Sequence, residues 1–304
     1  MRILLTGVTG QLGHTLHPIL SQHHEVIAPT RAELDLSDTA AIATFVTNCQ
    51  PDLIINPAAY TTVDKAETEP DLAQAINGIA PGEFAAQAKK RGIGLIHFST
   101  DYVYDGSLRD EQDVLTSYTE DAPTNPLNVY GKTKLAGEQA IIASGCQYLI
   151  FRTSWVYSTF GKNFLLTMLR LANERDELRV VNDQWGAPTS ANAIADISAS
   201  IVQQLCASEN PAQWWQLHQG LYHLTTTGRT SWCGFTQEIM RQASAGGKLK
   251  KAAPSVTGIP AVDYPTPAQR PVNSSLNTDL LASTFGVQIP AWETALAVCL
   301  SKMK

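Results

Sequence analysis

Short apolar runs alternate with longer amphipathic stretches along most of the chain. Continuous apolar runs of strand length are typical of strands that are buried on both faces. Several of the amphipathic stretches begin near Thr, Asp or Asn, which cap helix N-termini. This rhythm predicts an α/β fold with a doubly wound parallel sheet. We expect strands at 3–6, 25–28, 52–56, 94–99, 148–152 and 179–181, and helices at 11–21, 39–48, 70–91, 128–143, 163–173 and 191–206.

A glycine-rich loop follows the first expected strand. Gly7, Gly10 and Gly13 have the spacing Gly-x-x-Gly-x-x-Gly, and Leu12 and Leu16 begin a helical pattern. Glycine lets the backbone approach a ligand closely, and a helix N-terminus offers unpaired N–H groups and a partial positive charge. The loop therefore predicts a pyrophosphate site. Taken alone, the motif could also be a βα turn that binds nothing.

Tyr130 and Lys134 are four residues apart in an expected helix, so both side chains lie on one face. The ammonium group favours the phenolate, and we therefore expect Lys134 to lower the pKa of Tyr130 toward working pH. Tyr130 could then donate a proton to a ketone oxygen that is being reduced. The alternative for this pair alone is a solvated helical face.

Thr100 and Asp101 follow the expected strand at 94–99. In a doubly wound sheet, ligands bind beyond the carboxyl ends of the strands, so both side chains should reach that crevice. A hydroxyl there could hydrogen-bond to a carbonyl oxygen on which negative charge develops. A turn that merely closes the strand is the alternative for Thr100.

Composition narrows the kinds of partner. A length of 304 residues suggests about two domains, and a net charge of −6 with 16% charged residues argues against nucleic-acid binding and against a membrane surface. The five cysteines are unevenly spaced and lack a Cys-x-x-Cys motif, so we expect reduced thiols and a cytoplasmic location. Neither a signal peptide nor a membrane span is predicted.

The end of the second expected strand bears on the choice of cofactor. NAD-selective enzymes usually place an acidic residue there, against the ribose 2′-hydroxyl. This sequence instead reads Ala28-Pro-Thr-Arg31, and the guanidinium of Arg31 could pair with a 2′-phosphate. We therefore expect NADPH to be preferred.

The glycine loop, Tyr130 and Lys134 together resemble the extended short-chain dehydrogenase/reductase family. Further segments, spread from Met1 to about Trp292, are similar to its dTDP-4-dehydrorhamnose reductase branch. These segments are Asn56-Pro-Ala-Ala-Tyr-Thr61, Val63-Asp-Lys-Ala-Glu67, Ser99-Thr-Asp-Tyr-Val-Tyr104, Arg152-Thr-Ser-Trp-Val-Tyr157, Asn182-Asp-Gln-Trp-Gly-Ala-Pro-Thr189 and Tyr264-Pro-Thr-Pro-Ala-Gln-Arg-Pro271.

The resemblance implies a Rossmann domain formed mainly by residues 1–153 and a nucleotide-sugar domain formed mainly by 154–304. A segment at about 190–225 should return to the Rossmann sheet. The implied reaction is NADPH-dependent reduction of the C4 keto group of dTDP-6-deoxy-L-lyxo-4-hexulose to dTDP-L-rhamnose, with NADH use possible. Two alternatives stay open, namely reduction of another dTDP-4-keto-6-deoxy sugar and a non-catalytic NADP-binding subunit like that of methionine adenosyltransferase.

The resemblance also assigns residues to roles. Thr100 joins Tyr130 and Lys134 as the catalytic trio, and Lys134 also binds the nicotinamide ribose. Asp35 matches a position beside the adenine, although it could instead be a helix-start carboxylate. The implied cofactor residues are Gly7, Gly10, Gln11, Leu12, Gly13, Arg31, Asp35, Leu36, Ala58, Ala59, Tyr60, Thr61, Tyr130 and Lys134. The implied substrate residues are Val63, Thr100, Asp101, Tyr102, Tyr130, Trp155 and Arg270.

Some relatives hold a magnesium ion between two subunits through glutamates that follow the glycine loop and the Gly-Ala-Pro-Thr segment. Those positions here hold Thr15 and Asn192. Hard divalent cations prefer carboxylate oxygens, so we expect no structural metal. The chain is expected to be a monomer or a homodimer.

Overall fold

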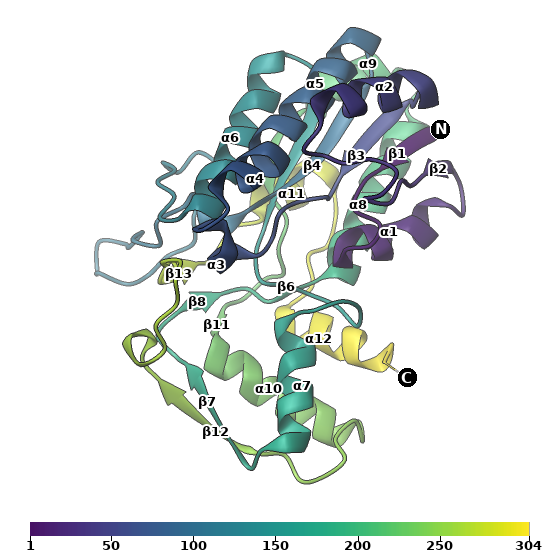
Figure 1. Cartoon of the computed structure of the whole chain (residues 1–304). Helices are drawn as coiled ribbons and strands as arrows, with labels where there is room; N and C mark the ends of the chain where they lie inside the picture. Colours follow the sequence, from purple (N-terminus) through teal and green to yellow (C-terminus); the bar gives the residue numbers. More distant parts are fainter. Residues whose placement is uncertain (304) are drawn as a thin grey trace.

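A six-stranded parallel sheet forms the centre of the molecule in the computed structural model, which describes residues 1–303 (Figure 1). The strand order is β10-β5-β4-β3-β1-β2, and every neighbouring pair is parallel. The predicted α/β fold with a doubly wound parallel sheet is therefore confirmed. The strands are β1 (Arg2–Leu5), β2 (Glu25–Ile27), β3 (Leu53–Asn56), β4 (Gly94–Thr100), β5 (Gln147–Thr153) and β10 (Gly220–His223).

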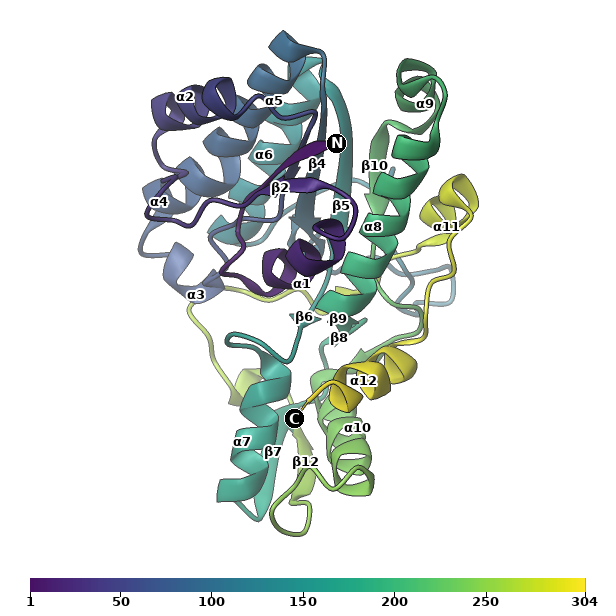
Figure 2. The same ribbon diagram turned by 90° about the vertical axis from the view of Figure 1, so that its right-hand side faces the viewer.

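Successive residues of the central strands pack into two different cores. Ile3 and Leu5 face one side of the sheet, and Leu4 faces the other. Both sets are buried, which explains why these strands are apolar throughout. One face is covered by α1 (Gln11–Leu20), α8 (Ala191–Ala207) and α9 (Pro211–His218), and the other by α2 (Thr39–Cys49), α5 (Ala80–Arg91) and α6 (Val129–Ser144) (Figure 2).

Two predicted elements differ from the structure. Residues 179–181 belong to β7 (Glu177–Val181), which pairs with β12 (Ser255–Ile259) outside the central sheet, and β10 is the sixth central strand instead. The expected helix at 70–91 is divided into α4 (Pro70–Gln74), a π-helical stretch (Ala75–Ile79) and α5. In that stretch the buried amide of Asn77 bonds to both main-chain polar groups of Tyr60, which ties the helix to the loop after β3.

A smaller lobe lies below the sheet in Figure 1 and has a core of its own. The chain enters it after Thr153, at the end of β5. Its helices are α7 (Phe164–Glu174), α10 (Trp232–Ala245) and α12 (Trp292–Ser301), and its strands include β7 and β12. The remaining elements are α3 (Val63–Ala66), α11 (Asp279–Phe285), β6 (Val156–Tyr157), β8 (Trp185–Gly186), β9 (Thr189–Ser190), β11 (Thr230–Ser231), β13 (Asn273–Ser274) and 3₁₀ turns at Asp101–Val103 and Ala261–Asp263.

The part of the chain that the structure describes contains no helix long and apolar enough to cross a membrane. All five cysteines are free thiols in it.

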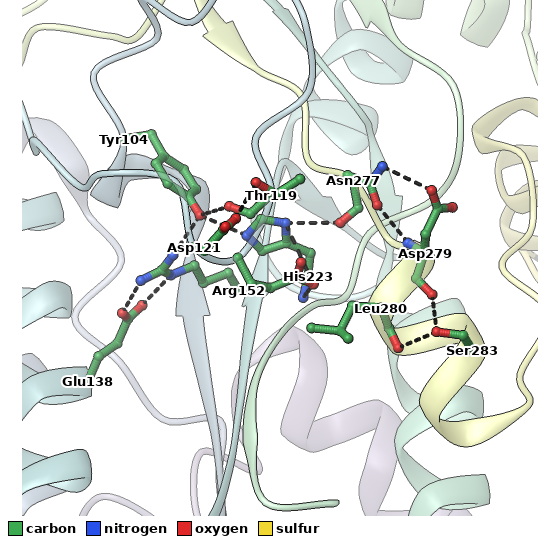
Figure 3. A network of polar contacts seen from close by, with 11 residues as sticks. Tyr104, Thr119, Asp121, Glu138, Arg152, His223, Asn277, Asp279, Leu280 and Ser283 are labelled. Carbon is green, nitrogen blue, oxygen red and sulfur yellow. Dashed lines mark hydrogen bonds and ion pairs between the residues drawn. The ribbon is translucent and has the colours of Figure 1, made fainter.

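A buried polar network joins the sheet to the loops that surround it (Figure 3). The Arg152 guanidinium on β5 donates to both carboxylate oxygens of Glu138 on α6, at 3.0 and 2.6 Å. Its Nη1 donates to the Tyr104 phenol oxygen at 2.6 Å, and that oxygen lies 2.9 Å from His223 Nε2 on β10. Ser99, on β4, donates to the same Glu138 carboxylate. The network thus connects three central strands with helix α6.

We expect Arg152→Met to lower the free energy of unfolding by about 3–5 kcal/mol, because it leaves the Glu138 carboxylate buried without a cation. Urea denaturation at neutral pH measures the loss. The double variant Arg152→Met with Glu138→Leu should lose less than the single variant, since it buries no unpaired charge. Equal stability of the single variant and the wild type would contradict this account of the network.

Candidate active site between two cavities

A cavity of about 760 Å³ lies at the carboxyl ends of β1, β3 and β4. This is where the strand order reverses, and where such sheets bind dinucleotides. Of the fourteen residues expected to bind the cofactor, thirteen line this cavity: Gly7, Gly10, Gln11, Leu12, Gly13, Arg31, Asp35, Leu36, Ala58, Ala59, Thr61, Tyr130 and Lys134.

The glycine loop has the close-packed geometry that a dinucleotide site needs. Gly7 has φ +63°, and a Cβ atom there would lie 2.9 Å from Ala58 Cα. A Cβ atom on Gly13 would lie 2.2 Å from Gly7 O, so the turn and the start of α1 tolerate no side chain at this position. Helix α1 has no side-chain N-cap and no acidic residue in its first turn. Its N-terminal N–H groups therefore suit a phosphate anion, and the residues present fit a dinucleotide.

Tyr60 is the one expected cofactor residue that does not line the cavity. Its phenol donates to Glu69 Oε2 at 2.6 Å, and this bond raises the pKa of Tyr60 to about 12. Its main-chain N–H donates to Asn77 Oδ1. The side chain thus holds the loop after β3 in place and turns away from the expected ligand.

The structure bears on the helix-start alternative for Asp35. The residue that caps helix α2 is Asp38, whose carboxylate accepts from the N–H groups of Ala40 and Ala41. Asp35 instead accepts from the main-chain N–H and the hydroxyl of Ser37, which lowers its pKa, and it lines the cavity together with Arg31. The helix-start interpretation of Asp35 is therefore wrong.

A second cavity, of about 890 Å³, opens between the sheet and the smaller lobe. The two cavities share Tyr130, Thr61 and Gln11 among their lining residues. All seven expected substrate residues line the second cavity: Val63, Thr100, Asp101, Tyr102, Tyr130, Trp155 and Arg270. A hydride donor in the first cavity and a carbonyl compound in the second would therefore meet beside Tyr130.

Lys134 lies at the base of the cofactor cavity and is almost fully buried. Its Nζ donates to Phe98 O at 2.7 Å and lies 3.2 Å from His97 Nε2. Burial lowers the pKa of Lys134 to about 8, against the opposing effect of the Glu138 carboxylate one turn along α6. Two of the three ammonium donors are thus directed at the protein, and one is left for the cavity.

The pKa of Tyr130 does not follow the expectation from the sequence. Burial raises the pKa of its phenol well above the usual value, and the charges of Asp101 and Tyr102 act in the same direction. The nearby Thr100 hydroxyl opposes this rise in pKa, and the lowering by Lys134 that we expected from the sequence is not found. The phenol is therefore protonated at neutral pH, which is the state that a proton donor requires.

Asp101 places an incompletely paired carboxyl group in the second cavity. Its Oδ1 accepts from the Thr100 hydroxyl at 2.9 Å, while its buried Oδ2 has no hydrogen-bond partner within residues 1–303. Burial raises the pKa of this carboxyl group to about 6, although the nearby hydroxyl groups of Ser274 and Thr100 oppose the shift. An unpaired buried polar atom beside a cavity is typical of a ligand contact.

The other expected substrate residues form the walls of this cavity. The Trp155 ring stacks on Trp232 at 3.5 Å between ring centroids, and its backbone has φ +46°. Arg270 Nη2 pairs with Asp64 Oδ2 at 2.8 Å, and Nη1 donates to the Tyr102 phenol oxygen at 3.2 Å. These contacts hold the Arg270 guanidinium in the wall of the second cavity.

Sequence reasoning missed four basic residues that line the same cavity. They come from the single stretch 162–179, in which Glu174, Asp176 and Glu177 mask the cations in the sequence: Lys162, Arg170, Arg175 and Arg179.

The expected absence of a structural metal stays a prediction. The Thr15 hydroxyl donates to Gln11 O within its own helix, at 2.8 Å. Within residues 1–303, no group of three His, Cys, Asp or Glu side chains is placed to hold a metal ion.

Comparison with known proteins agrees with this arrangement. The family model described as RmlD substrate binding domain matches residues 1–304. The chain belongs to this family. The family resemblance inferred from the sequence motifs is therefore confirmed, and it covers both lobes and both cavities.

Members of this family are similar to the chain along its whole length. The dTDP-4-dehydrorhamnose reductase of Burkholderia thailandensis is 41% identical over 300 residues, which cover 98% of each chain. The enzyme of the same name from Escherichia coli K12 is 41% identical over 307 residues, covering 100% of this chain and 98% of its own. The crystal structure of the Bacillus anthracis dTDP-4-dehydrorhamnose reductase in complex with NADP has a TM-score of 0.86 and 32% identity, with 99% of each chain covered.

We expect Asp101→Asn to stabilise the protein at pH 8 by about 2–3 kcal/mol, because the folded state raises the pKa of the carboxyl group by about two units. The folded protein binds more protons than the unfolded chain between about pH 4 and pH 6, so ionised Asp101 costs stability above that window. Denaturation at pH 5 and pH 8 measures the difference between variant and wild type. A difference that shrinks as the pH rises would contradict the raised pKa.

Proposed function

We propose that the protein reduces the C4 keto group of dTDP-6-deoxy-L-lyxo-4-hexulose with NADPH and forms dTDP-L-rhamnose. The observation that carries this proposal is that Tyr130 lines both cavities, with Lys134 in the first and Thr100 in the second. Family membership supports it, because relatives named dTDP-4-dehydrorhamnose reductase cover the whole chain. NADPH bound in the first cavity would supply the hydride.

Tyr130 donates the proton that the ketone oxygen takes up as it becomes a hydroxyl group. Its buried phenol is protonated at neutral pH, and an alkoxide is a much stronger base than a phenolate, so the transfer is downhill. The Thr100 hydroxyl lines the same cavity as Tyr130 and is fixed by its bonds to Asp101 Oδ1 and the Tyr102 N–H, which would hold a second hydroxyl group beside the developing negative charge.

Lys134 acts from the cofactor side of Tyr130. Its Nζ is held by Phe98 O and by the His97 ring, so its remaining N–H donor is directed by the protein before any ligand binds. We assign that donor to the nicotinamide ribose hydroxyls. The Gly7–Gly13 loop and the uncapped start of α1 would hold the pyrophosphate.

The nucleotide sugar is assigned to the second cavity. Trp155 offers an aromatic face for a ring of the substrate, Asp101 offers a free carboxylate oxygen for a sugar hydroxyl, and Arg270 offers a guanidinium for the diphosphate. Tyr102 and the backbone of Val63 complete the proposed contacts.

The reaction is tested with purified protein, NADPH and enzymatically prepared dTDP-6-deoxy-L-lyxo-4-hexulose, by following nicotinamide absorbance and identifying the sugar by NMR. We expect dTDP-L-rhamnose as the product. Tyr130→Phe should lower kcat by about 10²- to 10⁴-fold, since only the proton-donating oxygen is lost. NADPH affinity should change little and serves as the control for folding. Oxidation of NADPH by the variant at the wild-type rate would exclude Tyr130 as the proton donor.

Arg31 is assigned to the 2′-phosphate of NADPH, because it lines the cofactor cavity where NAD-selective enzymes carry an acidic residue. We expect Arg31→Ala to raise the KM for NADPH about tenfold, the effect of losing one charge-assisted hydrogen bond. The KM for NADH should stay nearly constant, which makes NADH the matched control. If the KM values for NADPH and NADH rose together, Arg31 would stabilise the loop without binding the 2′-phosphate.

A further inference from the structure

Four buried polar side chains form a line beneath the cofactor cavity, and two of them, Thr6 and Asn56, have no role in the reaction described above. The four are Thr6, which follows β1, Asn56 at the end of β3, His97 on β4 and Lys134 on α6, with exposed fractions of 2, 0, 0 and 1%. Thr6 Oγ1 lies 2.6 Å from Asn56 Oδ1, Asn56 Nδ2 lies 3.2 Å from His97 Nδ1, and His97 Nε2 lies 3.2 Å from Lys134 Nζ.

The direction of the hydrogen bonds in this line depends on the charge of Lys134. An ammonium group has only donors, so next to it His97 Nε2 must accept. His97 is neutral, because burial and the charge of Lys134 hold its pKa well below the usual value. Its single proton must then be on Nδ1, and Asn56 must present its amide oxygen to receive it.

The opposite direction requires a neutral lysine. In the structure, the Thr6 hydroxyl accepts from the Ala58 N–H at 3.3 Å and donates to Asn56 Oδ1 at 2.6 Å. The Asn56 amide nitrogen then donates to His97 Nδ1, and the imidazole proton is on Nε2. A proton on Nε2 that faces Nζ needs the lone pair of an amine as its acceptor.

We propose that Thr6, Asn56 and His97 form a reversible hydrogen-bond chain whose direction is set by the protonation of Lys134, so that His97 is a positioning residue for Lys134. With the ammonium, the bonds run from Lys134 to Thr6, and the Thr6 hydroxyl is free to donate into the cofactor cavity that it lines. With the amine, they run from Thr6 to Lys134. The imidazole keeps one proton in both states, and the proton that Lys134 loses leaves on the cavity side.

The groups around Lys134 allow both states near neutral pH. Glu138 on α6 favours the ammonium, burial favours the amine, and together they bring the pKa of Lys134 to about 8. The Glu138 charge is itself balanced by Arg152, and Tyr130 on the same helix is protonated. Because each direction of the chain satisfies the buried donors and acceptors, Nζ keeps its position whichever state is present.

The test uses the full-length protein with bound NADP⁺, labelled with ¹⁵N in histidine and in lysine, and long-range ¹H–¹⁵N NMR from pH 6 to pH 10. We expect His97 to carry its proton on Nδ1 at low pH and on Nε2 at high pH, with the same midpoint as the Lys134 Nζ titration. His223 is the internal control. Its Nδ1 lies 3.0 Å from Asn277 O, which can only accept, so its proton should stay on Nδ1 throughout.

Two variants distinguish a reversible hydrogen-bond chain from a purely structural role of His97. Lys134→Met removes the charge and should leave His97 in one tautomer at every pH. Thr6→Val removes the hydroxyl that donates to Asn56 in the amine state and accepts from Asn56 in the ammonium state, so both states lose one hydrogen bond and the midpoint should stay within about one pH unit of the wild-type value. Thr236→Val is the matched control, because Thr236 is also buried but bonds to Trp232 O in its own helix in the smaller lobe.

The inference rests on the proposed role of Lys134, but its readout requires no turnover. A protein that binds NADP⁺ without reducing the sugar would still show the exchange of tautomers, so failure of the proposed reaction is distinguishable from failure of the chain. A His97 ring that holds one tautomer while Lys134 titrates would overturn the proposal.

Discussion

The burial of Lys134 is the constraint on which the arrangement of the site depends. A cation that leaves water needs hydrogen-bond partners and a balancing charge, or it loses its proton. Phe98 O and the His97 ring supply the partners, and Glu138, one turn along α6, supplies the charge. These groups come from β4 and α6, so the edge of the sheet and the helix must be fixed relative to one another before Lys134 can face the cofactor cavity.

The buried network behind the site fixes this arrangement. Glu138 is held by Arg152 from β5 and by Ser99 from β4, one residue before Thr100. Arg152 continues to Tyr104 and His223, and through them to the main chain at Thr119 and Asn277 (Figure 3). Lys134 and Glu138 are four residues apart, so the group that faces the first cavity and the carboxylate buried against the sheet lie on one face of α6, and a change in the network should affect both.

The sequence predicted the parts of the site that depend on local pattern. Gly7 and Gly13 were predictable because a tight turn at the end of a strand excludes side chains. Thr100 was predictable as a cavity residue because parallel strands bring their carboxyl ends to one edge of the sheet, whereas its place beside Tyr130 was implied by the family resemblance. The direction of the Tyr60 side chain and the raised pKa of Tyr130 were not, because both depend on contacts between distant segments. Residues 179–181 were wrongly predicted as a strand of the central sheet, because an apolar run does not show which strand it pairs with.

The two lobes contribute side chains of opposite charge to the second cavity. The chain carries a net charge of −6, so its overall field opposes the approach of an anionic nucleotide sugar. The smaller lobe brings Lys162, Arg175 and Arg179 to a cavity whose other wall carries Asp101. Within residues 1–303, Arg175 and Arg179 take part in no ion pair, whereas Arg270 is already paired with Asp64. Local cations can therefore reverse the sign of the field at the cavity, while the sheet side contributes carboxylate and phenol groups to its lining.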